Sequence, residues 1–209
     1  MFIEKPPEAY RDLYRGSHWR FNTDEKAVYL TFDDGPIPEI TPWVLDLLDS
    51  YGIKATFFCV GDNVRKYPDI YRTILERGHI TGNHTFHHLQ GWQVTTETYL
   101  RDVEAAAKLI DSKLFRPPHG HMRLPQFHAL KKTYEIIMWD VVTRDYSRLM
   151  TAGQVFEVVK KYTRNGSVIV FHDSLKSGDR MKEALPRSID WLMGQGYGFW
   201  LVPVAPQLG

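Results

Sequence analysis

Residues 26–36 read KAVYLTFDDGP, and this stretch decides how the rest of the chain is interpreted. Its first part is largely apolar and β-branched or aromatic, which is typical of a buried strand. Two adjacent carboxylates, Asp33 and Asp34, end that strand. A buried charge is costly unless it is paired or binds a metal. Asp, Gly and Pro together also form ordinary turns, so the stretch alone leaves both a turn and a metal site open.

The composition is that of one globular domain with a sizeable core, because the 209 residues are 43% hydrophobic. A formal net charge of +1 gives no broad attraction for nucleic acid or anionic lipid. The single cysteine, Cys59, excludes an intrachain disulfide and a zinc finger. We find neither an apolar secretory signal nor a run of about 20 apolar residues, so we expect no membrane span and, by default, a cytoplasmic protein.

Short apolar segments alternate with segments of helical spacing along the chain. The predicted strands are 26–33, 54–60, 79–84, 114–117, 135–141, 167–172 and 198–203. The predicted helices are 41–50, 68–77, 95–111, 124–132, 151–163 and 180–195. Strands that alternate with helices predict an α/β fold with a parallel sheet, either closed into a barrel or open and doubly wound. In both architectures the functional edge lies at the C-terminal ends of the strands.

Ionisable side chains gather at those predicted strand ends. They are Asp33, Asp34, His84, Arg116, Asp140, Asp145, His172 and Asp173. A purely solvated surface would scatter such groups over the helices, so their placement predicts an active site at this edge of the sheet.

His84 and His88 are four residues apart in HTFHH. In a helical turn this spacing places both rings on one side, roughly 6 Å apart. Together with Asp34 they form a three-ligand set with open positions, as in catalytic zinc sites, and Asp33 is left to accept a proton from water. His87 is a competing ligand, and a surface turn is the plain alternative. Four other histidines are expected to be surface or half-buried residues without a role in the site. They are His18, His79, His121 and His128.

Arg116 precedes two prolines, so its backbone is stiff and its guanidinium is expected to orient Asp33; a structural ion pair is the alternative. Residues 117–120 can bring a backbone N–H close to an oxyanion, although spacing alone does not show this.

His172 ends a very apolar strand. It is either a core histidine or a general acid whose pKa is raised by Asp145 at its other ring nitrogen.

Five motifs occur in order: TFDDGP (31–36), HTFHH (84–88), RPPHG (116–120), DVVTRDY (140–146) and VFH (170–172). With them the chain resembles the polysaccharide deacetylases of carbohydrate esterase family four, the nodulation-protein-B homology domain, from about Glu25 to Pro203. The resemblance implies a distorted (β/α) barrel with about seven parallel strands in a single domain. The catalytic domain would span 25–209, with residues 1–24 as an N-terminal extension packing on the barrel.

The resemblance also implies a role for each matching residue. One divalent metal, zinc or else cobalt, nickel or manganese, would be held by Asp34, His84 and His88. Asp33 would be the base, His172 the acid, Arg116 the residue that orients Asp33, and Asp145 the residue that tunes His172. The backbone N–H of His119 would bind the oxyanion, and Tyr146 and Val170 would line the pocket for the acetyl methyl group. The family more commonly has Tyr, Trp and Leu at positions 119, 146 and 170, but no catalytic group is lost.

The function that follows is metal-dependent removal of acetyl groups from N-acetylated sugars of a peptidoglycan- or chitin-like glycan. The alternatives are an O-acetyl esterase on xylan-like glycans, a deacetylase of small molecules, and a non-catalytic carbohydrate-binding module. Trp92 and Trp139 are candidate platforms for a glycan beside the site, and core residues are the alternative for both. Such polymers lie outside the membrane, in contrast to the cytoplasmic default.

Overall fold

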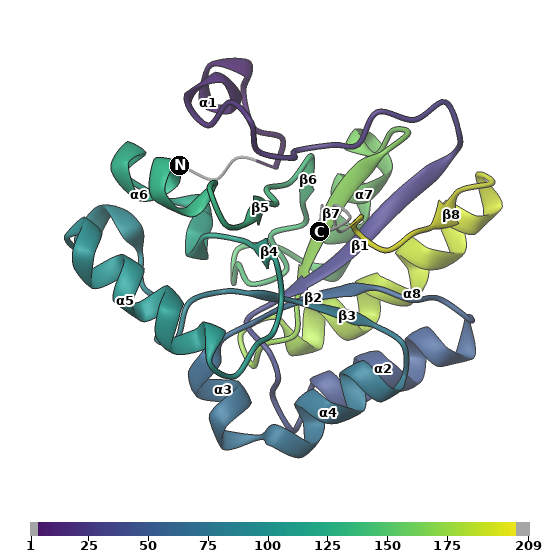
Figure 1. Ribbon diagram of the computed structural model, residues 1–209. Helices are drawn as coiled ribbons and strands as arrows, with labels where there is room; N and C mark the ends of the chain where they lie inside the picture. Colours follow the sequence, from purple (N-terminus) through teal and green to yellow (C-terminus); the bar gives the residue numbers. More distant parts are fainter. Residues whose placement is uncertain (1–3, 204–209) are drawn as a thin grey trace.

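The computed structural model describes residues 4–203, and β1 (Ala27–Asp33) lies at the centre of its sheet (Figure 1). All seven residues of β1 are buried, which explains why its sequence is so apolar. It pairs in parallel with three strands, which are β2 (Thr56–Cys59), β7 (Ser167–His172) and β8 (Gly198–Phe199). Asp33 therefore projects from the C-terminal edge of an interior strand that has neighbours on both sides.

The sheet follows the strand order β5-β4-β3-β2-β1-β7-β6, with β8 beside β1, and its pairings are all parallel. The other strands are β3 (Ile80–Asn83), β4 (Leu114–Phe115), β5 (Glu135–Ile136) and β6 (Val141–Val142). The sheet curls into an incomplete barrel with helices around it (Figure 1). The predicted distorted (β/α) barrel in a single domain is confirmed.

Two of the helices that connect the strands, α5 (Thr96–Ala107) and α7 (Ala152–Tyr162), begin with a threonine cap. Thr95 precedes α5 and Thr151 precedes α7, and each hydroxyl accepts a hydrogen bond from a backbone N–H of the first turn. The α-helices are α1 (Glu8–Leu13), α2 (Thr41–Ser50), α3 (Gly61–Lys66), α4 (Pro68–Glu76), α5 (Thr96–Ala107), α6 (Leu124–Leu130), α7 (Ala152–Tyr162) and α8 (Gly178–Gly194). Two short 3-10 helices are η1 (Gly91–Gln93) and η2 (Pro118–Gly120). Within residues 4–203, no helix has the length and apolar character needed to cross a bilayer.

One predicted strand, 135–141, is two strands in the structure. The N–H of Ile137 donates to the carbonyl of Phe115, whereas the N–H of Asp140 donates to the carbonyl of Val168. The chain therefore leaves β4 and crosses to β7 in the middle of the apolar run. The helices α1 and α3 were not predicted because six residues are too few to display helical periodicity.

Residues 4–20, which we call the N-terminal arm, lie across the opening between the edge strands. The carbonyl of Glu4 accepts from Val142 at 2.9 Å, and the N–H of His18 donates to Ile136 at 2.8 Å. Tyr14 and Trp19 are buried in an apolar cluster beneath α5 and α6. The predicted ranges 1–24 and 25–209 include residues 1–3 and 204–209, which lie outside the described residues.

Candidate active site and metal centre

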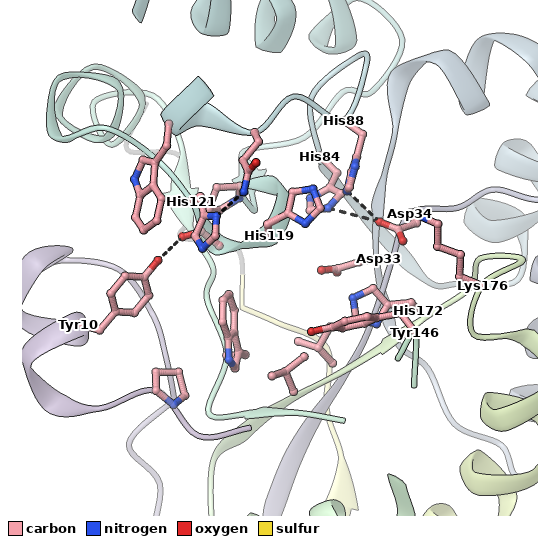
Figure 2. Close-up of a pocket in the computed structure, with 18 residues that line it drawn as sticks. Tyr10, Asp33, Asp34, His84, His88, His119, His121, Tyr146, His172 and Lys176 are labelled. Carbon is pink, nitrogen blue, oxygen red and sulfur yellow. Dashed lines mark hydrogen bonds and ion pairs between the residues drawn. The ribbon is translucent and has the colours of Figure 1, made fainter. Parts of the chain in front are cut away.

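A cavity of about 510 Å³ opens at the C-terminal ends of the strands (Figure 2). Eight of the ten predicted site residues line it, and the other two, Arg116 and Asp145, lie behind Asp33 and His172. The lining residues are Pro6, Tyr10, Asp33, Asp34, His84, His88, Gln90, Trp92, Pro117, His119, Gly120, His121, Trp139, Val142, Tyr146, Val170, His172 and Lys176.

Asp34, His84 and His88 form the cluster that could hold a metal, since one ligand atom of each lies within 4.8 Å of the others. Nε2 of His88 lies 3.1 Å and Nε2 of His84 lies 3.8 Å from Oδ1 of Asp34. Nδ1 of His84 lies 2.7 Å from the carbonyl of Arg116, which can only accept, so Nδ1 carries the proton. The lone pair of Nε2 then faces the cluster. Two imidazole nitrogens and one carboxylate fit a zinc ion with open coordination positions.

The turn that carries the two histidines is irregular, so the predicted helical turn is wrong. Thr85 and His88 both have left-handed backbones, with φ of 64° and 55°. The carboxylate of buried Asp102, on α5, accepts from the N–H groups of residues 86 and 87 at 2.8 and 2.9 Å. These contacts, rather than helical hydrogen bonds, bring the rings of His84 and His88 to 5.1 Å.

His87, the competing ligand, turns away from the cavity. Its Nδ1 lies 2.5 Å from Oδ1 of Asp102, and its side chain is 63% exposed. The His87 side chain therefore stabilises the outer side of the turn through its contact with Asp102.

The TFDDGP stretch (31–36) forms a turn and also supplies one member of this cluster. Asp34 has φ of 85°, and its carbonyl accepts from Nδ2 of Asn63 at 2.7 Å. The N–H of Gly35 donates to Oδ1 of Asp173 at 3.0 Å, and a Cβ at Gly35 would lie 2.0 Å from that carboxylate. Burial alone would raise the pKa of Asp34, but the hydrogen bond from His88 and nearby histidine charges hold it well below its usual range.

Asp33 is held by a deeply buried arginine. Nη1 of Arg116 donates to Oδ1 of Asp33 at 2.6 Å and to the Thr31 hydroxyl at 2.8 Å. The rest of the guanidinium donates to the carbonyls of residues 137 and 138 and lies over the ring of Phe58. Because Arg116 is only 1% exposed and bonded on every side, it fixes the orientation of the Asp33 carboxylate.

His172 lies beside Asp33 in the cavity, because the two residues are direct partners in the pairing of β1 and β7 (Figure 2). Its Nδ1 lies 2.7 Å from Oδ1 of Asp145, and its backbone N–H donates to Oδ2 of the same carboxylate. Burial alone would lower the pKa of His172, but the charge and hydrogen bond of Asp145 and the charges of Asp34 and Asp33 raise it to about 9. The ring of Tyr146 packs edge-on against it at 4.8 Å. His172 is therefore placed to present a proton on Nε2 to the cavity.

The loop around His119 and the neighbouring apolar wall complete the cavity. His119 has a left-handed backbone with φ of 58°, and Gly120 packs so closely that a Cβ there would lie 2.1 Å from Trp139. Val142 and Val170, which are partners in the pairing of β6 and β7, line the cavity, as does Tyr146. This wall suits a small apolar group next to the charged residues.

Some sequence expectations about the site were wrong or incomplete. Asp140 does not reach the cavity; it accepts from Arg11, Arg164 and Ser167 beside the start of β7, at the opposite edge of the sheet. His121, expected to be an ordinary residue, lines the cavity. Lining residues outside the loops and motifs that the sequence singled out are Pro6, Tyr10, Gln90 and Lys176. Tyr10 carries no signal in the sequence because Gly120, whose carbonyl accepts from its hydroxyl, lies 110 positions away.

Comparisons with known proteins agree on one family. Residues 20–136 match the family model described as polysaccharide deacetylase. A peptidoglycan-N-acetylglucosamine deacetylase of Bacillus cereus is 33% identical over 189 residues, which cover 87% of this chain and 88% of the relative. The peptidoglycan-N-acetylmuramic acid deacetylase PdaA of Bacillus subtilis is 30% identical over 205 residues, which cover 92% of this chain and 74% of the relative.

A solved structure gives the same result for the fold. It is that of a peptidoglycan N-acetylglucosamine deacetylase in complex with 4-naphthalen-1-yl-N-oxidanyl-benzamide. The two structures agree with a TM-score of 0.84 at 30% identity, over 95% of each chain.

Proposed function

Because this chain belongs to the polysaccharide deacetylase family, we propose that it is a metal-dependent hydrolase that deacetylates N-acetylated sugars of a peptidoglycan- or chitin-like glycan. The observation that carries the proposal is the meeting of three groups in one cavity. These groups are the Arg116–Asp33 pair, the Asp145–His172 pair and the cluster of Asp34, His84 and His88. The names of the relatives support an acetylated amino sugar as the substrate class.

Asp34, His84 and His88 would hold one divalent metal, and their donor set favours zinc over harder cations. The ligand of the related solved structure is an N-hydroxyamide, a group that binds divalent metals through oxygen, and this supports the same assignment. When bound, the ion supplies Lewis acidity, which polarises an amide carbonyl and lowers the pKa of water.

Asp33 acts as the general base in this proposal. Arg116 occupies Oδ1 of Asp33, so proton removal from the attacking water falls to Oδ2. As water adds to the acetyl carbon, negative charge develops on the carbonyl oxygen, and the backbone N–H of His119 donates to it. Val142, Val170 and Tyr146 surround the methyl group.

His172 acts as the general acid. An amide nitrogen leaves only as a neutral amine, so the C–N bond breaks as Nε2 of His172 delivers its proton to that nitrogen. Asp145 holds the other ring nitrogen and stabilises the protonated ring. The products are acetate and a free amino sugar. An O-acetyl ester needs less acid assistance, so an esterase on xylan-like glycans would use the same residues and must be tested beside the amide.

Acetate release is the test. Zinc-loaded and chelated protein are compared on acetylated chitooligosaccharides, peptidoglycan fragments and acetylated xylan. We expect zinc-dependent release from the N-acetylated substrates. Release from xylan alone would replace the proposal with an esterase, and no release from any substrate by zinc-loaded protein would contradict the proposed activity.

Asp33→Asn separates catalysis from metal binding. Without a base, kcat is expected to fall by a factor of about 10² or more, while one zinc per chain is retained because Asp33 is not a ligand. Zinc content by elemental analysis is measured beside the rate. Loss of zinc in Asp33→Asn would contradict the division of roles between Asp33 and Asp34.

A further inference from the structure

The cavity is longer than the chemistry requires. Figure 2 shows Asp34, His172 and Lys176 at one end, whereas Tyr10 and His121 lie at the other. None of the proposed catalytic or metal-binding side chains comes from this far end. Tyr10 and His121 lie there together with Gln90 and Trp92, which contact His121, and these side chains carry no formal charge when His121 is neutral. Burial lowers the pKa of His121, which favours the neutral ring.

Trp92 forms a fixed aromatic plane at this end. Its ring stacks on His121 with centroids 4.0 Å apart and an interplanar angle of 6°. The indole N–H donates to the carbonyl of Met122 at 2.6 Å, and Gln90 bonds Nδ1 of His121 at 2.7 Å. The side chain is nevertheless 46% exposed. A large apolar ring that is both held and exposed in a cavity is a binding surface rather than a core residue.

The N-terminal arm supplies the adjoining wall. The Tyr10 hydroxyl donates to the carbonyl of Gly120 at 2.6 Å, and the Tyr14 hydroxyl donates to that of Met122 at 2.6 Å. The tyrosine rings pack edge-on at 5.4 Å. The arm is therefore anchored on the loop that also carries His119, and the position of Tyr10 in the cavity is fixed before any ligand arrives.

We propose that Tyr10, Trp92 and His121 form a binding site for a second pyranose ring, the sugar that neighbours the one being deacetylated. This inference rests on the proposed function for the identity of the ligand. Pyranose rings have apolar C–H faces and hydroxyl edges. An uncharged aromatic plane with adjacent amide and phenol groups matches both features. The arm would thereby make the enzyme sensitive to glycan length, although it supplies no group to the deacetylation chemistry.

The test uses zinc-loaded full-length protein with N-acetylglucosamine and its β-1,4-linked disaccharide and tetrasaccharide. We expect kcat/KM to rise about tenfold or more from the mono- to the disaccharide, mainly through KM. Trp92→Ala should lose about tenfold more on the disaccharide than on the monosaccharide, and Tyr10→Ala should act in the same direction. Trp92→Phe keeps a ring and should retain most of the preference.

Trp200→Ala is the matched control, because Trp200 is also exposed, at 40%, but does not line the cavity. Its kinetics should match those of the unmodified chain. The proposal is overturned if the unmodified enzyme turns over mono- and disaccharide equally well, if Trp92→Ala affects both equally, or if Trp92→Phe is as damaging as Trp92→Ala.

A binding measurement separates this proposal from the proposed function. Chitotetraose is titrated by calorimetry into metal-free protein and into its Trp92→Ala variant. Binding that depends on Trp92 supports the sugar site even if no substrate is deacetylated. Turnover without any such binding preference supports the deacetylase and overturns the sugar site.

Discussion

Two histidines of one cavity are held in opposite protonation states by their surroundings. Burial lowers the pKa of His84 to about 4, although Asp33 and Asp34 oppose this. Burial acts in the same direction on His172, but Asp145 and the cavity carboxylates raise its pKa to about 9. A neutral imidazole is a metal ligand and a protonated one is an acid, so environment alone separates the two roles.

Asp145→Asn tests the origin of the His172 shift. Without the carboxylate, the His172 pKa in metal-free protein should fall from about 9 towards the ordinary value of about 6.5, as followed by NMR titration. The rate should then drop at least about tenfold more at pH 8 than at pH 6, since only the variant loses the proton between those values. Asp179→Asn, on the exposed start of α8, is the control. An unchanged His172 titration in Asp145→Asn would contradict the assignment.

The raised pKa of His172 also determines how the stability of the folded protein changes with pH. The folded-state pKa of His172 lies above the unfolded value of about 6.5. Its protonation therefore stabilises the folded protein fully below about pH 6.5, and this contribution disappears as the pH rises through about 9. The free-energy difference between the chain and Asp145→Asn in urea unfolding should shrink over that range. A difference that grows towards pH 10 would be inconsistent with this account.

At the scale of elements, the geometry of the metal cluster depends on a turn that belongs to no helix or strand. Residues 84–88 follow β3, and their shape is imposed by Asp102 from α5 and by Asn83, whose side chain accepts from the N–H of Thr85 at 2.8 Å. The packing of α5 on the sheet therefore sets the distance between His84 and His88.

Asp102→Ala should weaken zinc binding without removing a ligand. We expect the zinc Kd to rise about 10–100-fold, measured by competition with a chromogenic chelator. Glu104→Ala is the control, because Glu104 lies on the same helix but is exposed. If Asp102→Ala lowers the melting temperature but leaves the zinc Kd unchanged, the carboxylate stabilises the fold and does not position the ligands.

The sequence predicted elements best where one signal dominated. The apolar run 26–33 became β1, and polar groups at strand ends correctly located the cavity, because parallel strands bring their C-terminal ends to one edge. The spacing of His84 and His88 correctly predicted that the two rings are neighbours, but it predicted a helical turn that the structure does not have. The turn is shaped by Asp102, whose contact with it cannot be seen in a local sequence pattern. Asp140 was misplaced because the apolar run 135–141 hides the crossing from β4 to β7.

At the scale of the whole molecule, distant parts of the chain meet at the site. The candidate metal ligands come from residues 34–88, the proposed acid is residue 172, and part of the cavity wall comes from the N-terminal arm. The arm also links the two edges of the sheet through Val142 and Ile136. The part that the arm plays in lining the cavity could not be predicted from the sequence, because its contacts with the cavity depend on tertiary packing and not on a local pattern.

Zinc should stabilise the whole fold because its ligands come together only in the native state. At a free zinc concentration 100-fold above Kd the expected gain is about 2.7 kcal/mol. For a domain of this size that corresponds to a rise in melting temperature of about 5–10 °C. Calorimetry with and without a chelator measures it. Asp34→Asn should greatly reduce this rise in melting temperature, and Asp33→Asn should keep it. If instead Asp33→Asn abolishes the rise and Asp34→Asn keeps it, the metal ligand is Asp33 and the assignment is wrong.

Asp33 and His172 are direct partners in the register of β1 and β7, which the Thr31 hydroxyl pins by donating to Ile169 at 2.9 Å. A single residue inserted within 167–171 would turn His172 to the other face of the sheet, because side chains alternate along a strand. An insertion after exposed Gly52, between α2 and β2, would be absorbed by the connection. Related chains that keep every motif but gain or lose one residue inside either strand should therefore have the fold without the chemistry, so strand length is as much a signature of activity as the motifs themselves.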